Sequence, residues 1–226
     1  MRLYLASTSP ARLTTLRAGG IEPVVVPSQV DEDAAVVAAA PESTAQMVLL
    51  LARLKAEAVA GRAGAEQLEG TGQLDSAEQL DGFILGADSA FELDGIGYGK
   101  PHTAEVARER WRLQRGRTGQ LHTGHWLIDH RAGHGPHGDG IAFPAAGAVS
   151  TACVTFANDI SDDEIDSYIA TGEPLEVAGA FTIDSLGAPF ISSITGDPHA
   201  VVGLSLATLR ELFLGFDVSW PQLWNR

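Results

Sequence analysis

The sequence predicts an α/β fold with a mixed central sheet and flanking helices. Apolar runs of strand type alternate along the chain with segments that carry helix-capping and helix-ending residues, which is typical of α/β proteins. The 226 residues are 45% hydrophobic, enough to bury a sizeable core. Internal repeats and coiled-coil heptads are absent from the sequence. We therefore expect residues 1–226 to form a single domain, either in one body or in two closely joined lobes.

The first helix is expected directly after the first strand. The apolar run at residues 2–6 is of strand type. Ser9 can cap the helix that follows, Pro10 suits its first turn and Gly19 ends it. A second strand is expected at residues 22–28.

A long helix is expected after an acidic loop at residues 30–34. It is predicted to begin near Ser43 or Thr44, where a hydroxyl can cap it. Lys55 is expected at the edge of its buried face. That face is predicted from apolar residues at helical spacing, which are Met47, Leu51, Leu54 and Ala58.

Two glycine-rich segments indicate loop inserts, residues 61–82 and residues 131–147. The elements expected between them are a strand at 83–93, a hairpin turn at Asp94-Gly95, a helix at 104–114 and a strand at 120–129. The elements expected after them are a strand at 149–158, a helix with a capping box of Ser161 and Glu164, strands at 180–184 and 188–194, and a terminal helix at 204–216.

The acidic charge narrows the range of partners. A formal net charge of −14 repels polyanions, so we expect neither nucleic acid nor an anionic membrane surface as a partner. A small anionic substrate is compatible if positive charge is concentrated locally. The N-terminal apolar stretch is too short for a secretory signal, and a lone cysteine, Cys153, cannot form an internal disulfide. These features predict a cytoplasmic protein.

The segment from Ser7 to Arg12 combines hydroxyls, a helix N-terminus and a guanidinium. Free amides at that end, the positive end of the helix dipole and an arginine all favour an anion such as phosphate. Ser7, Ser9 and Arg12 are therefore candidate phosphate-binding residues. The alternative is a plain Ser-Pro helix cap with Arg12 on the surface.

Asp88 closes the apolar run FILGAD and is the candidate catalytic residue. An aspartate there lies either at a functional edge of the sheet or, at a cost, in the core. Free aspartate has a pKa of about 3.9, so an ionised Asp88 can hold a metal or orient a water. Glu32 is a candidate second oxygen ligand for Mg²⁺ or Mn²⁺. The alternatives are an Asx turn at Asp88 and a merely solvated acidic loop around Glu32.

Lys55 and Lys100 are candidate ligands of phosphate oxygens. Lys55 can also simply extend its ammonium into solvent from the helix edge, and Lys100 can be an ordinary charge at the end of a hairpin. The arginines at 108, 112 and 115 share a helical face, which is more often a solvated surface than a binding site.

Taken together, these segments resemble the Maf family of nucleotide pyrophosphatases. The family pattern is LASxSPRR, VDE, LAxxKA, GAD, GKP, TGEPxxxAGAY and VVGLPL, in that order. The chain carries similar motifs in the same order, which are LASTSPAR at 5–12, VDE at 30–32, LARLKA at 51–56, GAD at 86–88, GKP at 99–101, TGEPLEVAGAF at 171–181 and VVGLSL at 201–206. Apart from the two inserts, the match spans nearly the whole chain.

The resemblance implies a cytoplasmic, metal-dependent hydrolase that cleaves nucleoside triphosphates to the monophosphate and pyrophosphate, clearing modified or non-standard nucleotides. It also implies an inosine triphosphatase-like fold, with two lobes around a cleft, that often forms a homodimer. Asp88 matches the family's proton acceptor. The family's phosphate and metal cluster is matched by Ser7, Arg12, Glu32, Lys55 and Lys100.

Three departures from the family pattern bear on substrate choice. Ala11 stands where family branches have arginine or tryptophan, Ser89 where they have threonine or glutamine, and Asp184 where they have glutamine or glutamate. Neither the pyrimidine (dTTP/UTP) preference nor the 7-methyl-GTP preference of those branches is therefore assigned. The small Ala11 also leaves Arg12 with one partner fewer on the phosphate.

Two other functions are compatible with these residues. One is a nucleotide-binding regulator of cell division or septum formation that senses nucleoside triphosphates without hydrolysing them. The other is removal of the terminal phosphate, which would release orthophosphate instead of pyrophosphate.

Overall fold

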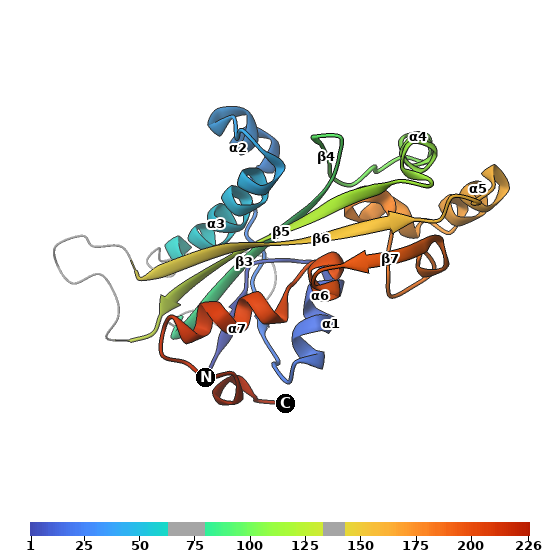
Figure 1. Cartoon of the computed structure of the whole chain (residues 1–226). Helices are drawn as coiled ribbons and strands as arrows, with labels where there is room; N and C mark the ends of the chain where they lie inside the picture. The colour runs from blue at the N-terminus through green and yellow to red at the C-terminus, as the bar shows by residue number, and fades with distance from the viewer. Residues whose placement is uncertain (63–79, 133–142) are drawn as a thin grey trace.

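The computed structural model describes residues 1–62, 80–132 and 143–226. In these ranges the strands form one seven-stranded sheet with the order β2-β1-β3-β5-β6-β7, and β4 pairs with β3 (Figure 1). Strand β1 runs parallel to β2 and β3, and the remaining pairs are antiparallel, so the predicted mixed sheet is confirmed. The strands are β1 Leu3–Leu5, β2 Val24–Val25, β3 Gly82–Leu93, β4 Ile96–Tyr98, β5 Thr118–His130, β6 Ala145–Phe156 and β7 Ile191–Thr195.

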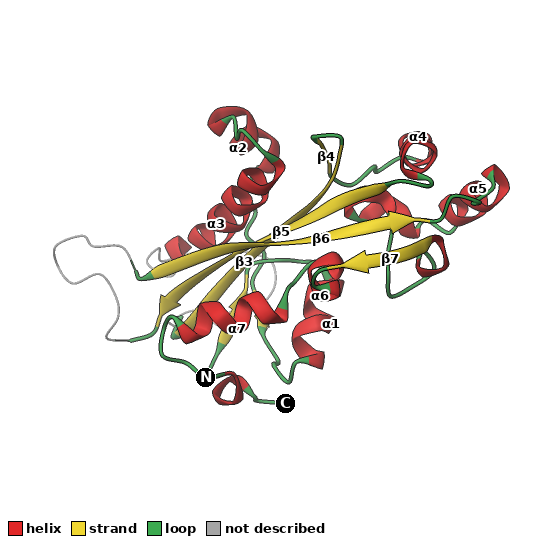
Figure 2. Cartoon of the chain, viewed as in Figure 1, coloured by secondary structure: helices red, strands yellow, loops and turns green. Residues whose placement is uncertain are grey.

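Helices cover both faces of the sheet (Figure 2). Helix α3 packs across β3 and β5 on one face, while α1, α6 and α7 lie on the other, and α4 and α5 lie near one end of the long strands. The α-helices are α1 Pro10–Ala18, α2 Glu32–Ala39, α3 Thr44–Arg62, α4 Ala104–Gln114, α5 Asp162–Ala170, α6 Pro198–Val202 and α7 Leu206–Leu214. The short 3₁₀ helices are η1 Glu173–Glu176, η2 Ala178–Ala180, η3 Ala188–Phe190 and η4 Trp220–Leu223.

The buried face of α3 differs from the predicted one. Of the four predicted residues only Leu51 is buried, and Lys55 belongs to the face instead of its edge. The reason is close backbone packing: a Cβ added to Gly86 of β3 would lie 1.9 Å from the carbonyl oxygen of Ala52. Because glycine allows the helix backbone to approach the sheet closely, the side of α3 that carries small residues faces the sheet. The buried residues are Thr44, Val48, Leu51, Ala52, Lys55, Ala56 and Val59.

The core is divided along β3. Phe83, Leu85 and Ala87 pack with α1 and α7, whereas Phe91 and Leu93 pack with α4 and α5. On the opposite face of the strand, Ile84 packs against α3. The polar pair Asp88-Ser89 lies between the two apolar clusters. Two lobes with separate cores thus meet at the middle of one strand.

Several predicted elements are confirmed, together with the capping and turn residues from which they were predicted. Helix α4 has the predicted bounds, and Ser161 and Glu164 form the capping box of α5. The Asp94-Gly95 turn joins β3 to β4 with positive φ at both residues, as a tight hairpin requires.

Other predicted elements are corrected by the structure. The acidic segment is not a loop, because Asp31 caps helix α2 by accepting from the amide of Ala34. Strand β6 begins inside the predicted insert at 131–147, and residues 180–184 form no strand. Helix α3 also extends to Arg62, and most of both inserts, 63–79 and 133–142, lies outside the described residues. Among the helices that the structure describes, none has the length and apolar character needed to cross a membrane.

Candidate active site

The middle of β3 has an open edge. Strand β1 pairs with β3 only as far as Leu85, where the amide of Ala6 donates to its carbonyl, and β4 pairs only from Phe91 onward. Strand β5 pairs with β3 along the whole of the opposite edge of β3. Strands β1 and β4 therefore lie on the same edge of β3, and a gap separates them. No described strand pairs with residues 86–90 there. Polar groups from both faces of the sheet converge at this gap.

Asp88 lies at the gap and turns its side chain toward α3. Its Oδ1 is 2.6 Å from Nζ of Lys55, and Oε1 of Glu32 is 2.9 Å from the same nitrogen. We call these three residues the Asp88 cluster. Burial raises the pKa of Asp88, while the charges of Lys55 and Arg12 act against the rise. The carboxylate is therefore a stronger base than a free aspartate.

Lys55 departs most from its expected place. Its side chain is only 8% exposed, so the ammonium does not extend into solvent. It bridges Asp88 on the sheet and Glu32 at the start of α2. Three of the predicted site residues, Glu32, Lys55 and Asp88, therefore lie together in the structure.

Arg12 approaches the same gap from α1, on the other face. Its Nη1 donates to Oγ of Ser7 at 3.0 Å, its Nη2 to Oγ of Ser89 at 3.2 Å and its Nε to the Gly203 carbonyl at 2.9 Å. We call these four residues the Arg12 network. No described carboxylate pairs directly with this buried guanidinium, although Asp88 is near enough for its charge to act on it. A buried cation with neutral partners is a favourable place for an anion.

Ser7 and Ser9 organise the turn that leads into α1. The Ser7 hydroxyl accepts from the amide of Ser9 at 3.2 Å, and the Ser9 hydroxyl accepts from the amide of Arg12 at 3.5 Å. Ser9 is thus the helix N-cap, as the alternative interpretation expected. Arg12 itself is buried, so the other half of that alternative, a surface arginine, is wrong.

Lys100 and Asp184 lie outside both groups. Nζ of Lys100 is 3.6 Å from a carboxylate oxygen of Glu176, and its side chain is 52% exposed. Asp184 is exposed in the bend after η2, and no described contact joins it to Asp88. Strand β4 nevertheless runs along β3 toward the gap, because Ile96, Gly97 and Tyr98 pair with successively earlier residues of β3. Lys100 therefore leaves the strand on the side of the open edge.

Ala11, the third expected specificity residue, lies half-buried beside Arg12 in the first turn of α1. Its methyl group offers no hydrogen bond to a ligand. The three departures from the family pattern thus lie in different places: Ser89 in the Arg12 network, Ala11 beside it and Asp184 apart from it.

Two polar residues of β5, Thr123 and His125, lie near the Arg12 network and were missed by sequence reasoning. The Thr123 hydroxyl is 2.9 Å from Oγ of Ser89 and donates to the Ala200 carbonyl. His125 accepts from the amide of Ser205 through Nε2, and burial, followed by the charge of Arg12, lowers its pKa to about 4. A neutral imidazole is thus available as an acceptor. Only the cross-strand register, which the sequence does not reveal, places Thr123 opposite Ser89 and His125 opposite Ala87.

The residues present fit a hard divalent cation. Glu32 and Asp88 offer carboxylate oxygens that contact one shared nitrogen, Nζ of Lys55. Among the described residues, no group of three or more His, Cys, Asp or Glu side chains could hold a metal ion. Two carboxylates completed by substrate phosphates are the arrangement that Mg²⁺ commonly accepts.

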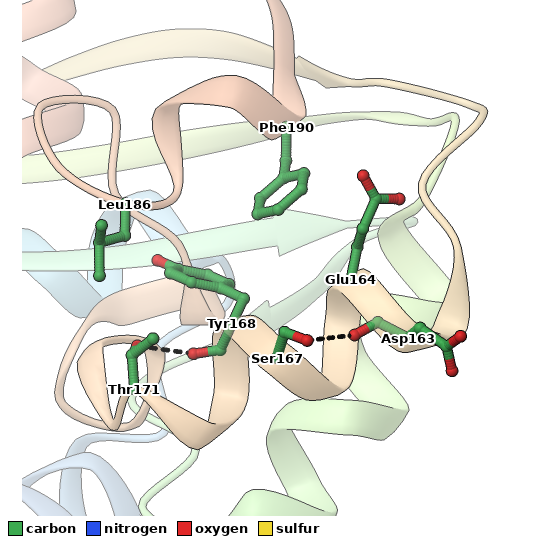
Figure 3. Close-up of a pocket in the computed structure, with 7 residues that line it drawn as sticks. All are labelled: Asp163, Glu164, Ser167, Tyr168, Thr171, Leu186 and Phe190. Atoms are coloured by element: carbon green, nitrogen blue, oxygen red, sulfur yellow. Dashed lines mark hydrogen bonds between the residues drawn. The ribbon is translucent and has the colours of Figure 1, made fainter.

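A surface depression on α5 is separate from this site. It lies beside Tyr168 and Phe190 (Figure 3). Its volume is about 340 Å³. None of its lining residues belongs to the Asp88 cluster or the Arg12 network. The Tyr168 hydroxyl donates to Glu173, so this wall of the depression has a structural role.

Comparisons with known proteins agree with the motif pattern. The family described as "Maf-like protein" matches residues 2–216. A protein from Leifsonia xyli named "Nucleoside triphosphate pyrophosphatase" is 61% identical over 100% of this chain and 98% of its own length. A protein of the same name from Salinispora tropica is 46% identical over 100% of this chain and 88% of its own length.

The solved structure of the Staphylococcus aureus Ham1 protein covers 96% of this chain and 100% of its own. Its TM-score is 0.42 at 14% identity, which is too low to support an argument about the fold. The family match over nearly the whole sequence and the two close relatives, by contrast, are decisive. This chain belongs to the Maf family.

Proposed function

We propose that the chain hydrolyses nucleoside triphosphates to the monophosphate and pyrophosphate. The observation that carries the proposal is the convergence of two buried cations, Arg12 and Lys55, and the carboxylate of Asp88 at the open edge of β3. In a protein of net charge −14, such local positive charge is what a triphosphate requires. The relatives that share the family are named for this activity.

The triphosphate binds between the start of α1 and the Asp88 cluster. The buried guanidinium of Arg12 and the ammonium of Lys55 neutralise its oxygens, and Lys100 contributes a third cation from the end of β4. Ser7 and Ser89 hold the guanidinium plane, so the cation is oriented before the substrate arrives. Ser9 contributes the capped helix start, which favours an anion.

Asp88 accepts the proton of the attacking water. The water oxygen forms a bond to the α-phosphorus, the bond from that phosphorus to the α–β bridging oxygen breaks, and pyrophosphate leaves with the electron pair. The raised pKa of Asp88 suits a general base. Glu32 and Asp88 would hold a Mg²⁺ or Mn²⁺ ion, which when bound neutralises phosphate charge and acidifies water.

A panel of nucleoside triphosphates, incubated with the pure protein and Mg²⁺ or Mn²⁺, tests the proposal. We expect pyrophosphate from at least one of them, including modified or non-standard nucleotides. Orthophosphate alone would instead show removal of the terminal phosphate. Binding without any product would support a non-hydrolysing regulator of cell division, which the relatives' names do not favour. A cytoplasmic location and a homodimer stay predictions.

A further inference from the structure

Helix α4 carries one arginine that behaves differently from its neighbours. Arg108 pairs with Asp166 of α5 at 2.6 Å, and Arg112 pairs with Asp162 at 2.9 Å. These ion pairs attach α4 to α5. Arg110 instead turns toward the loop after β4.

Arg110 contacts groups that carry no charge. Its Nη1 donates to the Gly99 carbonyl at 2.5 Å, and its guanidinium lies 5.4 Å from the ring centroid of Tyr98. No ion pair joins it to a carboxylate in the described ranges. Burial lowers its pKa, which means that the charged form bears a desolvation cost without a counter-ion.

The contact fixes the backbone immediately before Lys100. The Gly99 carbonyl also accepts from the amide of Gly179 at 3.3 Å, and the amide of His102 donates to the Leu175 carbonyl at 3.1 Å. Hydrogen bonds thus hold the chain on both sides of Lys100. The Lys100 side chain itself is left half-exposed, with a carboxylate of Glu176 3.6 Å from its ammonium. A fixed backbone with an accessible ammonium is the arrangement of a pre-organised ligand.

We propose that Arg110 is a positioning residue that holds the Gly99 carbonyl so that Lys100 presents its ammonium to the substrate phosphates. The inference rests on the proposed function, and it adds a residue that none of the family motifs contains. Tyr98, whose register partner is Phe91, gives the guanidinium a flat surface on which to stack. Arg110 acts entirely through the loop and contacts no substrate.

A double-mutant cycle tests this role. Arg110→Gln should raise KM for a hydrolysed triphosphate about fivefold, with kcat changed far less, because a partly disordered Lys100 loses binding energy. Combined with Lys100→Gln, the same substitution should have no further effect. Arg108→Gln is the matched control, since it removes an equal charge from the same helix without touching Gly99, and it should leave KM unchanged. Isothermal titration with a non-hydrolysable triphosphate should show the same pattern in Kd.

Three outcomes would overturn the inference: an unchanged KM in Arg110→Gln, an equal loss in Arg108→Gln, or a full additional loss in the Lys100→Gln background. If Arg110→Gln unfolds below the assay temperature, Arg110→Lys keeps a donor for the Gly99 carbonyl and should raise KM less than twofold. A wild-type chain that neither binds nor cleaves any triphosphate would refute the proposed function together with this role. A wild-type enzyme that works normally while Arg110→Gln matches it refutes this role alone.

Discussion

Nζ of Lys55 lies 2.6 Å from Oδ1 of Asp88 in a buried ion pair that joins α3 to β3. Removing one partner of a buried pair usually costs about 3–5 kcal/mol, because the other charge is left alone. Here Glu32 is a second partner for the ammonium at 2.9 Å. The Asp88 carboxylate can therefore be neutralised without leaving the Lys55 ammonium unpaired. A loss of activity in such a variant can then be told apart from a loss of stability.

The first expected outcome concerns Asp88→Asn. Pyrophosphate release should fall below detection, because the amide cannot accept the proton of water. Stability should not fall: a carboxyl whose pKa is raised on folding makes the native state less stable above its unfolded pKa, and asparagine removes that penalty. Pyrophosphate assays and thermal unfolding at pH 7 check both parts. Near-normal turnover would refute the assignment of the base.

The second outcome concerns Arg12→Lys, which keeps the charge. An ammonium cannot reproduce the three directed contacts to Ser7, Ser89 and the Gly203 carbonyl. We expect Kd for a non-hydrolysable triphosphate to rise about ten- to a hundredfold, equivalent to the loss of one or two charge-assisted hydrogen bonds. Arg17→Lys on the same helix, where the exposed arginine pairs with Glu22, is the control. Equal Kd values for Arg12→Lys and wild type in titration calorimetry would contradict an anion site there.

The third outcome concerns packing under the site. Gly86→Ala places a methyl group 1.9 Å from the Ala52 carbonyl oxygen, where rigid backbone leaves no room. We expect a loss of at least about 3 kcal/mol in the free energy of unfolding, because α3 must move off the sheet. Gly61→Ala in the same helix meets nothing within 4 Å and should stabilise by about 0.5–1 kcal/mol. Urea unfolding of both variants checks the difference, and similar midpoints would show that the contact can relax.

Sequence reasoning succeeded where nearby residues determine the bounds of a helix or a turn. Capping residues and turn residues act within a few positions, which is why the bounds of α4, the capping box at Ser161 and the Asp94-Gly95 hairpin were predictable. The motif pattern also selected Glu32, Lys55 and Asp88 as site residues, and the structure brings these three side chains into contact.

Sequence reasoning failed where the structure of an element depends on the surface that packs against it. The buried face of α3 follows the two glycines on the sheet, Gly86 and Gly124, instead of the largest apolar residues of the helix. Helix α2 was missed because none of its side chains is buried, so no periodic pattern indicates it. Thr123 reaches Ser89 only through the antiparallel register of β3 and β5.

The last outcome concerns Glu173, whose carboxylate holds the segment at 182–187. It accepts from the hydroxyls of Tyr168, Thr182 and Ser185 and from two backbone amides, those of Leu186 and Gly187. Burial alone would raise its pKa, but these donors outweigh burial and lower the pKa from 4.5 to about 2.

A carboxyl with a depressed pKa stabilises the fold fully above its unfolded pKa and loses that contribution as pH falls toward the folded value. Wild-type stability should therefore fall between about pH 4.5 and about pH 2, in part through Glu173. Glu173→Gln should lower the free energy of unfolding at pH 7 by about 1–3 kcal/mol, because five donors lose a charged acceptor. It should also flatten the acid limb, whereas Glu109→Gln, at an exposed site on α4, should follow wild type. Urea midpoints measured from pH 7 to pH 2 decide the matter: an acid limb of Glu173→Gln parallel to that of wild type would show that the five hydrogen bonds do not tune this carboxyl.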